Sequence, residues 1–584
     1  MERNKINKKF VTVFFLFILV LVSLIIIDFN LHNPYGLTTD SLYHLSIINH
    51  IDKTKNIPVV EPQTGIDKPE YPTGFHTWLI TISNLTGMDK NFVTFNSNLL
   101  MTLILIFSMF VFIRRISNEK IAILILIILI FSGGIGWILY PKILSVNFKD
   151  VFDAYMMNTG LFEGNLFSTK LLSSSTQTIA FILMFLFFYL LHNKRYFLSS
   201  LTLIIISYTH RTSIIFILIF LVFYLFAMEE KNKRIVIIPI MGLLGSLFWN
   251  YYYPTIFFLS NKFIMFFLRI DNVLRVFLLG SIIAFFIPNK AWNKKFFKLG
   301  FIAFLIIFIL DVFFHFNNLT GEFYTPVYKQ IIFVFGPLLI SFFFIDQVDN
   351  DKNKLIYIFL FTVLFISQTN ALTTVMGPER ILIFMMIPLA FIYSKLIVES
   401  KENKFKIILS LLLLLLLVGN FVDLNRYTRN SAFGGKIPLY SESLNFIKTN
   451  LPEDVRIITS TGFCASSSRN SIIIPAMTDR NIYCTYVFSY NDFLTKELKF
   501  ADVPPFNQSI IKGIIDDKNF MYKTDVLSRR LQVAYLFENP DMNITGTKLK
   551  ELNTHILTTK KECDVFTKYY ELIYSDTKVC MFKI

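Results

Sequence analysis

The first part of the chain alternates long apolar runs with short polar turns, and this pattern predicts a bundle of membrane-spanning helices. A helix needs about 20 consecutive apolar residues to cross the hydrocarbon core of a bilayer. A spanning backbone must also satisfy its own polar groups, so helices are the structure expected of such runs. Thirteen runs approach or reach this length: 10–27, 91–113, 119–140, 171–191, 196–209, 212–228, 234–251, 273–288, 296–314, 327–345, 354–372, 379–398 and 404–423. The short ones, below about 18 residues, are 196–209, 212–228 and 273–288.

The turns between these runs carry basic residues on alternate connections, on the same side as the basic N-terminus. Short cytoplasmic loops are enriched in Lys and Arg, so this side is predicted to face the cytoplasm. The first run lacks a following small-residue cleavage site, which indicates an uncleaved anchor. The chain is then predicted to be a multi-pass protein of the cell (plasma) membrane, and thirteen spans place its C-terminus on the outer side. The basic turns contain Arg114, Arg115, Lys194, Arg195, Lys231, Lys233, Arg234, Lys290, Lys294, Lys295, Lys352, Lys354, Lys401, Lys404 and Lys406.

Near residue 425 the pattern changes to short elements that are typical of a soluble domain. A helix is expected over 440–448, with Ser441 as its N-cap. Strands are expected over 455–459, 471–474, 532–537 and 578–582. Because helices alternate with these strands, 425–584 is predicted to be an extracytoplasmic α/β domain. Residues 1–424 form the predicted polytopic α-helical membrane domain, whose first outer loop covers 28–90.

The composition supports a membrane protein and excludes several other classes. Hydrophobic residues make up 54% of the 584 residues, and the mean hydropathy is +0.55, too apolar for a soluble chain of this length. The net charge of +15 is largely explained by cytoplasmic anchoring turns. Those turns do not form one continuous basic face, so no nucleic-acid partner is expected. The sequence has no phosphate-binding loop, dinucleotide fingerprint, metalloprotease motif or nucleophile elbow.

All four cysteines lie in the predicted outer domain, at Cys464, Cys484, Cys563 and Cys580. This distribution fits two disulfides in an oxidising compartment, for example Cys464–Cys484 and Cys563–Cys580. Three pairings are possible and four buried thiols are an alternative, so the sequence leaves the pairing open.

The first outer loop contains the most distinctive candidate site. Asp40 and His44 are four residues apart and share a face if 41–51 is helical. A carboxylate there is suited to act as a general base or to ligate a divalent metal. The alternative is that Asp40, together with Thr39, caps the helix N-terminus. The apolar positions Leu42, Leu45 and Ile48 suggest that this helix lies flat on the membrane surface.

Further polar residues gather in the other predicted outer connections. Asp150, Asp153 and Glu163 supply oxygen ligands suited to Mg²⁺ or Mn²⁺, although solvated loop charges are the simpler interpretation. Arginine suits bidentate phosphate binding, and lysine can neutralise a phosphate oxygen, but arginines at a membrane boundary also reach toward lipid headgroups for anchoring. The candidates for phosphate binding are Lys68, Arg211 and Arg380, with His210 and Glu379 beside them.

The first loop also resembles a known family. Its segments Asp40-Ser-Leu-Tyr-His44, Lys68-Pro69, Tyr71-Pro-Thr-Gly-Phe-His76 and Leu85-Thr-Gly87 are similar to those of the GT-C glycosyltransferases, in the protein O-mannosyltransferase and aminoarabinose transferase branch. The chain departs from this branch in having one acidic residue where many mannosyltransferases have two, and YPTGFH in place of PPLFYW. The WWDYG signature of oligosaccharyltransferases is absent, which argues against transfer of a whole glycan to asparagine.

This resemblance implies an inverting transfer of a sugar from a polyprenyl or dolichyl phosphate to an acceptor hydroxyl on a glycan, lipid or protein. It makes Asp40 the general base. A divalent metal or the cations Lys68, Arg211 and Arg380 would stabilise the departing lipid phosphate. Glu163 or Asp153 would be the second acidic residue, with Asp150 and His44 as further candidates. The residues assigned to the acceptor or the cleft are Tyr71, His76, His210 and Glu379.

Two other functions are compatible with the sequence. A transporter or flippase of lipid-linked saccharides would show internal repeats and ionisable residues near the membrane midplane. The chain has no evident repeat, and Asp311 is the one obvious acid within a predicted span. A non-catalytic relative with the same fold is the third interpretation, because fold alone does not fix function.

Overall fold

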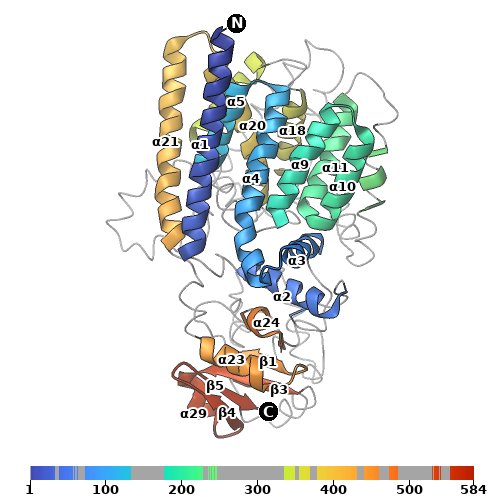
Figure 1. Ribbon diagram of the computed structural model, residues 1–584, viewed down its shortest axis with the longest axis vertical. Coiled ribbons are helices and arrows are strands. Elements are labelled where there is room, and N and C mark those ends of the chain that lie inside the picture. The colour runs from blue at the N-terminus through green and yellow to red at the C-terminus, as the bar shows by residue number, and fades with distance from the viewer. Residues whose placement is uncertain are drawn as a thin grey trace, which may run out of the picture. The chain divides into compact units, whose positions relative to one another are not determined.

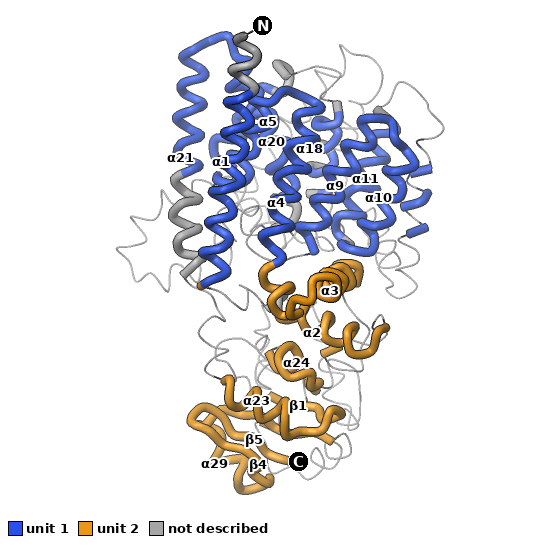
Figure 2. Tube along the Cα trace, in the orientation of Figure 1, with its two compact units in different colours: residues 1–31, 97–430 blue, residues 32–96, 431–584 orange. Residues whose placement is uncertain are grey.

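A computed structural model of the protein describes residues 2–32, 39–56, 58, 62–63, 73–132, 176–227, 235, 237–238, 240–242, 244–245, 335–348, 354–367, 378–429, 440–459, 473–483, 529, 532–533, 535–537, 540 and 553–584. The chain forms two compact units (Figure 2). Unit 1 consists of residues 1–31 and 97–430, and unit 2 of residues 32–96 and 431–584. The first outer loop therefore groups with the C-terminal region, whereas the sequence-based division placed it with the membrane domain.

The described secondary-structure elements of unit 1 are all helices (Figure 1). Two apolar segments that lie mostly in unit 1, Lys9–His32 and Lys90–Ile116, are long and apolar enough to cross a membrane by length and composition. Shorter apolar helices run over Thr176–His192, Tyr196–Thr209 and Thr212–Leu225. The bounds of the elements are α1 Glu2–His32, α4 Lys90–Ile116, α5 Glu119–Phe131, α9 Thr176–His192, α10 Tyr196–Thr209, α11 Arg211–Ala227, the 3-10 helix η3 Gly336–Val348, α18 Lys354–Ser367, α20 Pro378–Glu399 and α21 Asn403–Arg429.

These helices fall on most of the predicted spans. The predicted spans 273–288 and 296–314 lie outside the described residues, and several others are described only in part, among them 119–140, 171–191, 234–251, 327–345 and 354–372. The total of thirteen spans therefore stays a prediction. Inside unit 1, phenylalanine rings pack against one another, as in the stacked pair Phe216–Phe384 with centroids 4.3 Å apart. Asn30 and Asn98 exchange two side-chain amide hydrogen bonds, of 3.0 and 2.9 Å.

Unit 2 contains a five-stranded sheet in the order β2-β1-β3-β5-β4. β1 pairs in parallel with β2 and β3, while β5 pairs antiparallel with β3 and β4. This mixed sheet with its helices confirms the predicted α/β character of the C-terminal region. The strands are β1 Arg456–Thr459, β2 Asn481–Ile482, β3 Thr554–Thr559, β4 Glu571–Ser575 and β5 Val579–Lys583; the helices are α2 Thr39–Thr54, α3 Gly74–Thr86, α23 Ser441–Asn450, α24 Ile473–Thr478, the 3-10 helix η7 Lys560–Glu562 and α29 Cys563–Phe566.

Two predicted strands and one predicted cap are wrong. The described end of the run 471–474, Ile473 and Ile474, lies in the helix α24, because Pro475 has no N–H to offer a sheet and is tolerated in a first helical turn. The run 532–537 is helical at each of its described residues, since a short apolar run suits a buried helix as well as a strand. Ser441 is the first residue of α23, and Tyr440 occupies the N-cap.

The structure pairs Cys563 of α29 with Cys580 of β5 in a disulfide, with Cα atoms 5.8 Å apart. This pairing is one of those that the sequence left open. Cys464 and Cys484 lie outside the described residues.

Candidate active site

The helix α2 carries the candidate base. The predicted helix over 41–51 is confirmed, and it extends over Thr39–Thr54. Asp40 lies in its first turn, where the helix dipole favours negative charge. The side chain of Asp40 is outside the described part of the structure. α2 ends where Lys55 takes a left-handed backbone conformation, with φ of 56°.

The apolar side of α2 is covered by protein, so the expectation that it lies flat on the membrane is wrong. Leu42 and Leu45 have no exposed surface and belong to one hydrophobic cluster with residues of the C-terminal region. Ile48 is 1% exposed. Helical spacing revealed the apolar side correctly, but the same spacing suits burial against lipid or against protein.

The two histidines of the first loop meet each other, one helical turn beyond Asp40. His44 Nδ1 of α2 lies 2.9 Å from His76 Nε2 of α3, and the two residues are 3% and 0% exposed. Phe75 packs edge-on against both imidazoles, with ring centroids 5.3 and 5.4 Å away. In such a pair one ring donates an N–H and the other accepts it, so the contact fixes both ring orientations. It thereby ties α2 to α3.

The described residues do not by themselves fit the Mg²⁺ or Mn²⁺ expected from the sequence. They contain no group of three or more His, Cys, Asp or Glu side chains placed to hold a metal ion. His44 and His76 direct one nitrogen each toward the other, and hard cations prefer oxygen ligands. Asp150, Asp153 and Glu163, which would supply such oxygens, lie outside the described residues.

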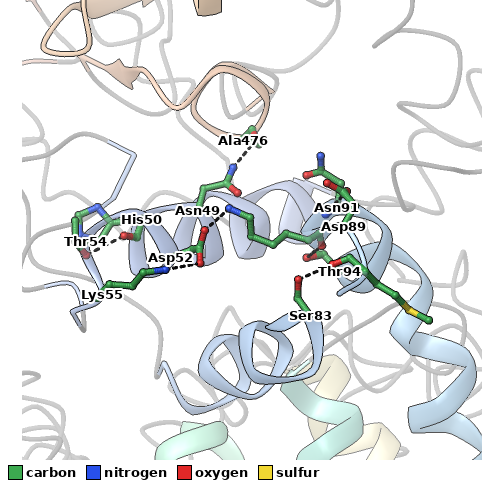
Figure 3. Close-up of polar contacts among 12 residues, drawn as sticks. Asn49, His50, Asp52, Thr54, Lys55, Ser83, Asp89, Asn91, Thr94 and Ala476 are labelled. Carbon is green, nitrogen blue, oxygen red and sulfur yellow. Dashed lines mark hydrogen bonds and ion pairs between the residues drawn. The ribbon is translucent and has the colours of Figure 1, made fainter. Parts of the chain in front are cut away.

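A charged cluster fastens the far end of α2, as Figure 3 shows. Asp52 pairs with Lys55, at 2.9 Å, and with Lys90, the first residue of α4. The hydrogen bonds from Lys90 and then Lys55 lower the pKa of the Asp52 carboxyl. The ion pairs therefore keep Asp52 charged and join α2 to the beginning of α4.

The connection from α3 to α4 has a specific turn that accounts for one family motif. Gly87 of the Leu85-Thr-Gly87 segment ends α3 in a left-handed conformation with φ of 68°, which glycine adopts without strain. Ser83 Oγ donates to the carbonyl of Met88 at 2.7 Å (Figure 3). Asp89 then caps α4 by accepting the backbone N–H groups of the second and third residues of that helix, at 2.8 and 3.1 Å.

Contacts with the C-terminal region hold the other side of α2. Asn49 Nδ2 donates to the carbonyl of Ala476 in α24 at 3.0 Å (Figure 3). The N–H of Ile482 in β2 donates to the carbonyl of Gln63 at 2.8 Å. An exposed ion pair joins Lys53 to Glu453. These contacts could not be predicted from the sequence, because each joins residues several hundred positions apart.

The other predicted site residues are distributed along the chain. His210 lies between α10 and α11 and is 6% exposed; its Nδ1 is 2.8 Å from Ser213 Oγ and accepts the Ser213 N–H at 3.3 Å. This contact caps α11, so His210 has a local structural role. Arg211, Glu379 and Arg380 lie in first turns, of α11 and α20, and their side chains are not described. Lys68 and Tyr71 lie outside the described residues.

Solved structures share the fold over nearly the whole chain. One is the Archaeoglobus fulgidus oligosaccharyltransferase tethered with an acceptor peptide, at 12% identity and a TM-score of 0.52, covering 97% of this chain and 74% of that chain. Another is ArnT from Cupriavidus metallidurans bound to undecaprenyl phosphate, at 9% identity and a TM-score of 0.50, covering 98% and 97%. No protein-family model and no curated protein sequence matches the chain. At these identities the two structures show a shared fold, and it agrees with the fold that the first-loop resemblance implies.

Proposed function

We propose that the protein is a membrane glycosyltransferase that moves a sugar from a polyprenyl or dolichyl phosphate to an acceptor hydroxyl on the outer face of the membrane. The observation that supports this most is the fold shared with ArnT, whose solved structure holds undecaprenyl phosphate. The second support is an acidic residue, Asp40, in the first turn of a helix that follows the first apolar segment. A lipid-linked donor also suits a chain in which 54% of the residues are hydrophobic.

In the proposed reaction Asp40 is the general base. Its carboxylate takes the proton of the acceptor hydroxyl, and the hydroxyl oxygen attacks the anomeric carbon of the donor sugar. The bond between that carbon and the phosphate oxygen breaks, and the lipid phosphate leaves with the electron pair. A single displacement of this kind inverts the anomeric configuration.

Positive charge near the leaving phosphate would lower the barrier of this step. Lys68, Arg211 and Arg380 are the proposed phosphate-binding residues, because guanidinium and ammonium groups suit phosphate oxygens. Glu163 or Asp153 is the proposed second acidic residue. If a divalent cation takes part, oxygen ligands for Mg²⁺ or Mn²⁺ would come from these outer carboxylates.

The proposed topology follows from the distribution of charge. The chain would cross the membrane thirteen times with its N-terminus in the cytoplasm, and unit 2 would lie on the outer face. The disulfide between Cys563 and Cys580 supports this side for unit 2, because disulfides persist in oxidising compartments.

Transfer of radiolabelled sugar from polyprenyl-phosphate donors by the purified protein tests the proposal. Asp40→Asn should fold normally and lose roughly 100-fold or more of the transfer rate, because loss of a general base typically costs 10²–10⁴-fold. Asp564→Asn, which changes an exposed carboxylate of α29, is the matched control and should retain the wild-type rate.

Equal activity of Asp40→Asn and wild type would remove Asp40 from the mechanism and direct mutagenesis to Glu163 and Asp153. Specific lipid binding without transfer from any donor would instead favour the flippase, transporter or non-catalytic interpretations. Movement of a lipid-linked saccharide between leaflets of a reconstituted vesicle separates a transporter from a non-catalytic binding protein.

A further inference from the structure

The helix α2 belongs to the hydrophobic core of the C-terminal α/β region as much as to the first outer loop. Leu42 and Leu45 lie in one buried cluster with Ile447 of α23, Ile474 of α24 and Leu557 of β3. These residues have no exposed surface. The position of α2 is therefore determined by residues that follow it by about four hundred to five hundred positions in the sequence.

Polar contacts also join the first loop to the C-terminal region. We call the surface made by Leu42, Leu45, Asn49 and Gln63 with their C-terminal partners the seam. The amide of Asn49 binds the backbone carbonyl of Ala476, so the bond depends on where the main chain of α24 lies. Close by in sequence, the carbonyl of Gln63 accepts the N–H of Ile482 in β2, which is an edge strand of the sheet. Two segments of the first loop thus contact consecutive elements of the C-terminal region, α24 and β2.

We propose that this seam positions Asp40, and that Asn49 is a positioning residue for the transfer reaction. The inference depends on the proposed function. Asn49 follows Asp40 by nine residues, about 13 Å along a rigid helix, so a tilt of α2 at the seam moves its first turn. Misplacement of a catalytic group by about 1 Å can cost on the order of 100-fold in rate. The C-terminal region is then part of the structure that positions the active site.

Asn49→Ala tests the seam with two independent measurements on the full-length protein in nanodiscs. The first is hydrogen exchange of the α2 amides. Alanine has a higher helix propensity than asparagine, so a helix without the seam should exchange more slowly in the variant. Loss of the bond to Ala476 predicts the opposite, a rise of roughly 2- to 10-fold, because a hydrogen bond contributes about 0.5–1.5 kcal/mol.

The second measurement separates kcat from the donor KM in the transfer assay. A positioning role predicts that kcat falls by roughly 10-fold while the donor KM changes by less than about 2-fold. Asn91→Ala, an exposed asparagine of α4, is the matched control and should leave both measurements unchanged.

Unchanged or slower exchange of α2 in Asn49→Ala would overturn the seam as a support of this helix. Faster exchange with an unchanged kcat would overturn the positioning role. If the wild type transfers no sugar from any donor, the positioning role is excluded together with the proposed function. The exchange result then still decides whether the seam holds α2.

Discussion

The helices α1 and α2 both carry apolar side chains, but these side chains have different surroundings. In α1 the side chains of Phe10, Leu16 and Leu24 are 68%, 53% and 59% exposed, which suits a helix surrounded by lipid. In α2 the side chains of Leu42 and Leu45 are fully buried, and protein covers them. Spacing along a helix reveals an apolar face, whereas its partner is decided by residues elsewhere in the chain.

The largest expected effect comes from removing a buried side chain of α2. Leu45→Ala should destabilise unit 2 by about 2–5 kcal/mol, because it deletes fully buried methyl groups and leaves a cavity in the shared core. Hydrogen exchange of the β1 and β3 amides in nanodiscs measures this loss, since these strands pair at the centre of the sheet.

Leu16→Ala in α1 is the matched substitution at a lipid-facing position. It should change stability by less than about 1 kcal/mol, because lipid fills the space that the side chain leaves. Equal losses of stability in the two variants would contradict the proposed difference, in which lipid surrounds α1 and protein buries α2.

Features that depend on local sequence could be predicted, whereas features that depend on distant residues could not. The apolar runs predicted α1 and α4 because length and hydropathy are local properties. The β-branched residues of the run 471–474 predict a strand, whereas the structure places Ile473 and Ile474 in the helix α24, which includes Pro475.

The candidate site shows the same limit. His44 and His76 were singled out separately by residue type and motif, and the structure brings them within 2.9 Å of each other. Asp52 could have been noticed from its spacing with Lys55, but its bond to Lys90 depends on the fold of the loop. Asn49 was missed, because nothing local distinguishes it from any polar residue of a half-exposed helix.

Reduction of the disulfide is expected to have the next largest effect, and to act on unit 2 alone. All four cysteines lie at or beyond residue 464, within unit 2. Cys563 and Cys580 close a loop with a sequence separation of 17, for which chain entropy predicts about 3 kcal/mol of stabilisation. β5 also contributes Val579 and Met581 to the cluster that covers α2.

Exchange of the α2 amides with and without reductant checks this prediction. Exchange should accelerate in α2 and stay constant in the α1 segment from Lys9 to Leu31. The double variant Cys563→Ser with Cys580→Ser should behave like the reduced wild type; any further response to reductant would come from Cys464 and Cys484. An equal acceleration of amide exchange in α1 would contradict the idea that the C-terminal region stabilises α2 and not α1.

The smallest expected effect is a dependence on pH, again confined to unit 2. Burial, together with the nearby Lys53, lowers the pKa of His50 in α2, and burial with Lys583 lowers the pKa of His555 in β3. Below about pH 6.5 the unfolded chain therefore binds protons that the folded chain rejects. The stability of unit 2 should fall as the pH drops from 7 toward 5, in contrast to the usual loss caused by carboxylates at lower pH.

Comparing the α2 exchange rates of the wild type and His50→Gln at pH 7 and pH 5.5 isolates one of these groups. Glutamine does not titrate in this range, so the variant should lose part of the acid sensitivity while His555 retains the rest. A steeper loss of stability in the variant would require protonated His50 to stabilise the fold, which is the reverse sign.

Asp52 gives a second window at lower pH. Its depressed pKa supplies stability at neutral pH that is lost as the pH falls below about 4. His50, Asp52 and His555 all belong to unit 2, whereas residues 1–31 belong to unit 1. The exchange of α1 from Lys9 to Leu31 should therefore follow neither window, and the two helices would differ in pH response.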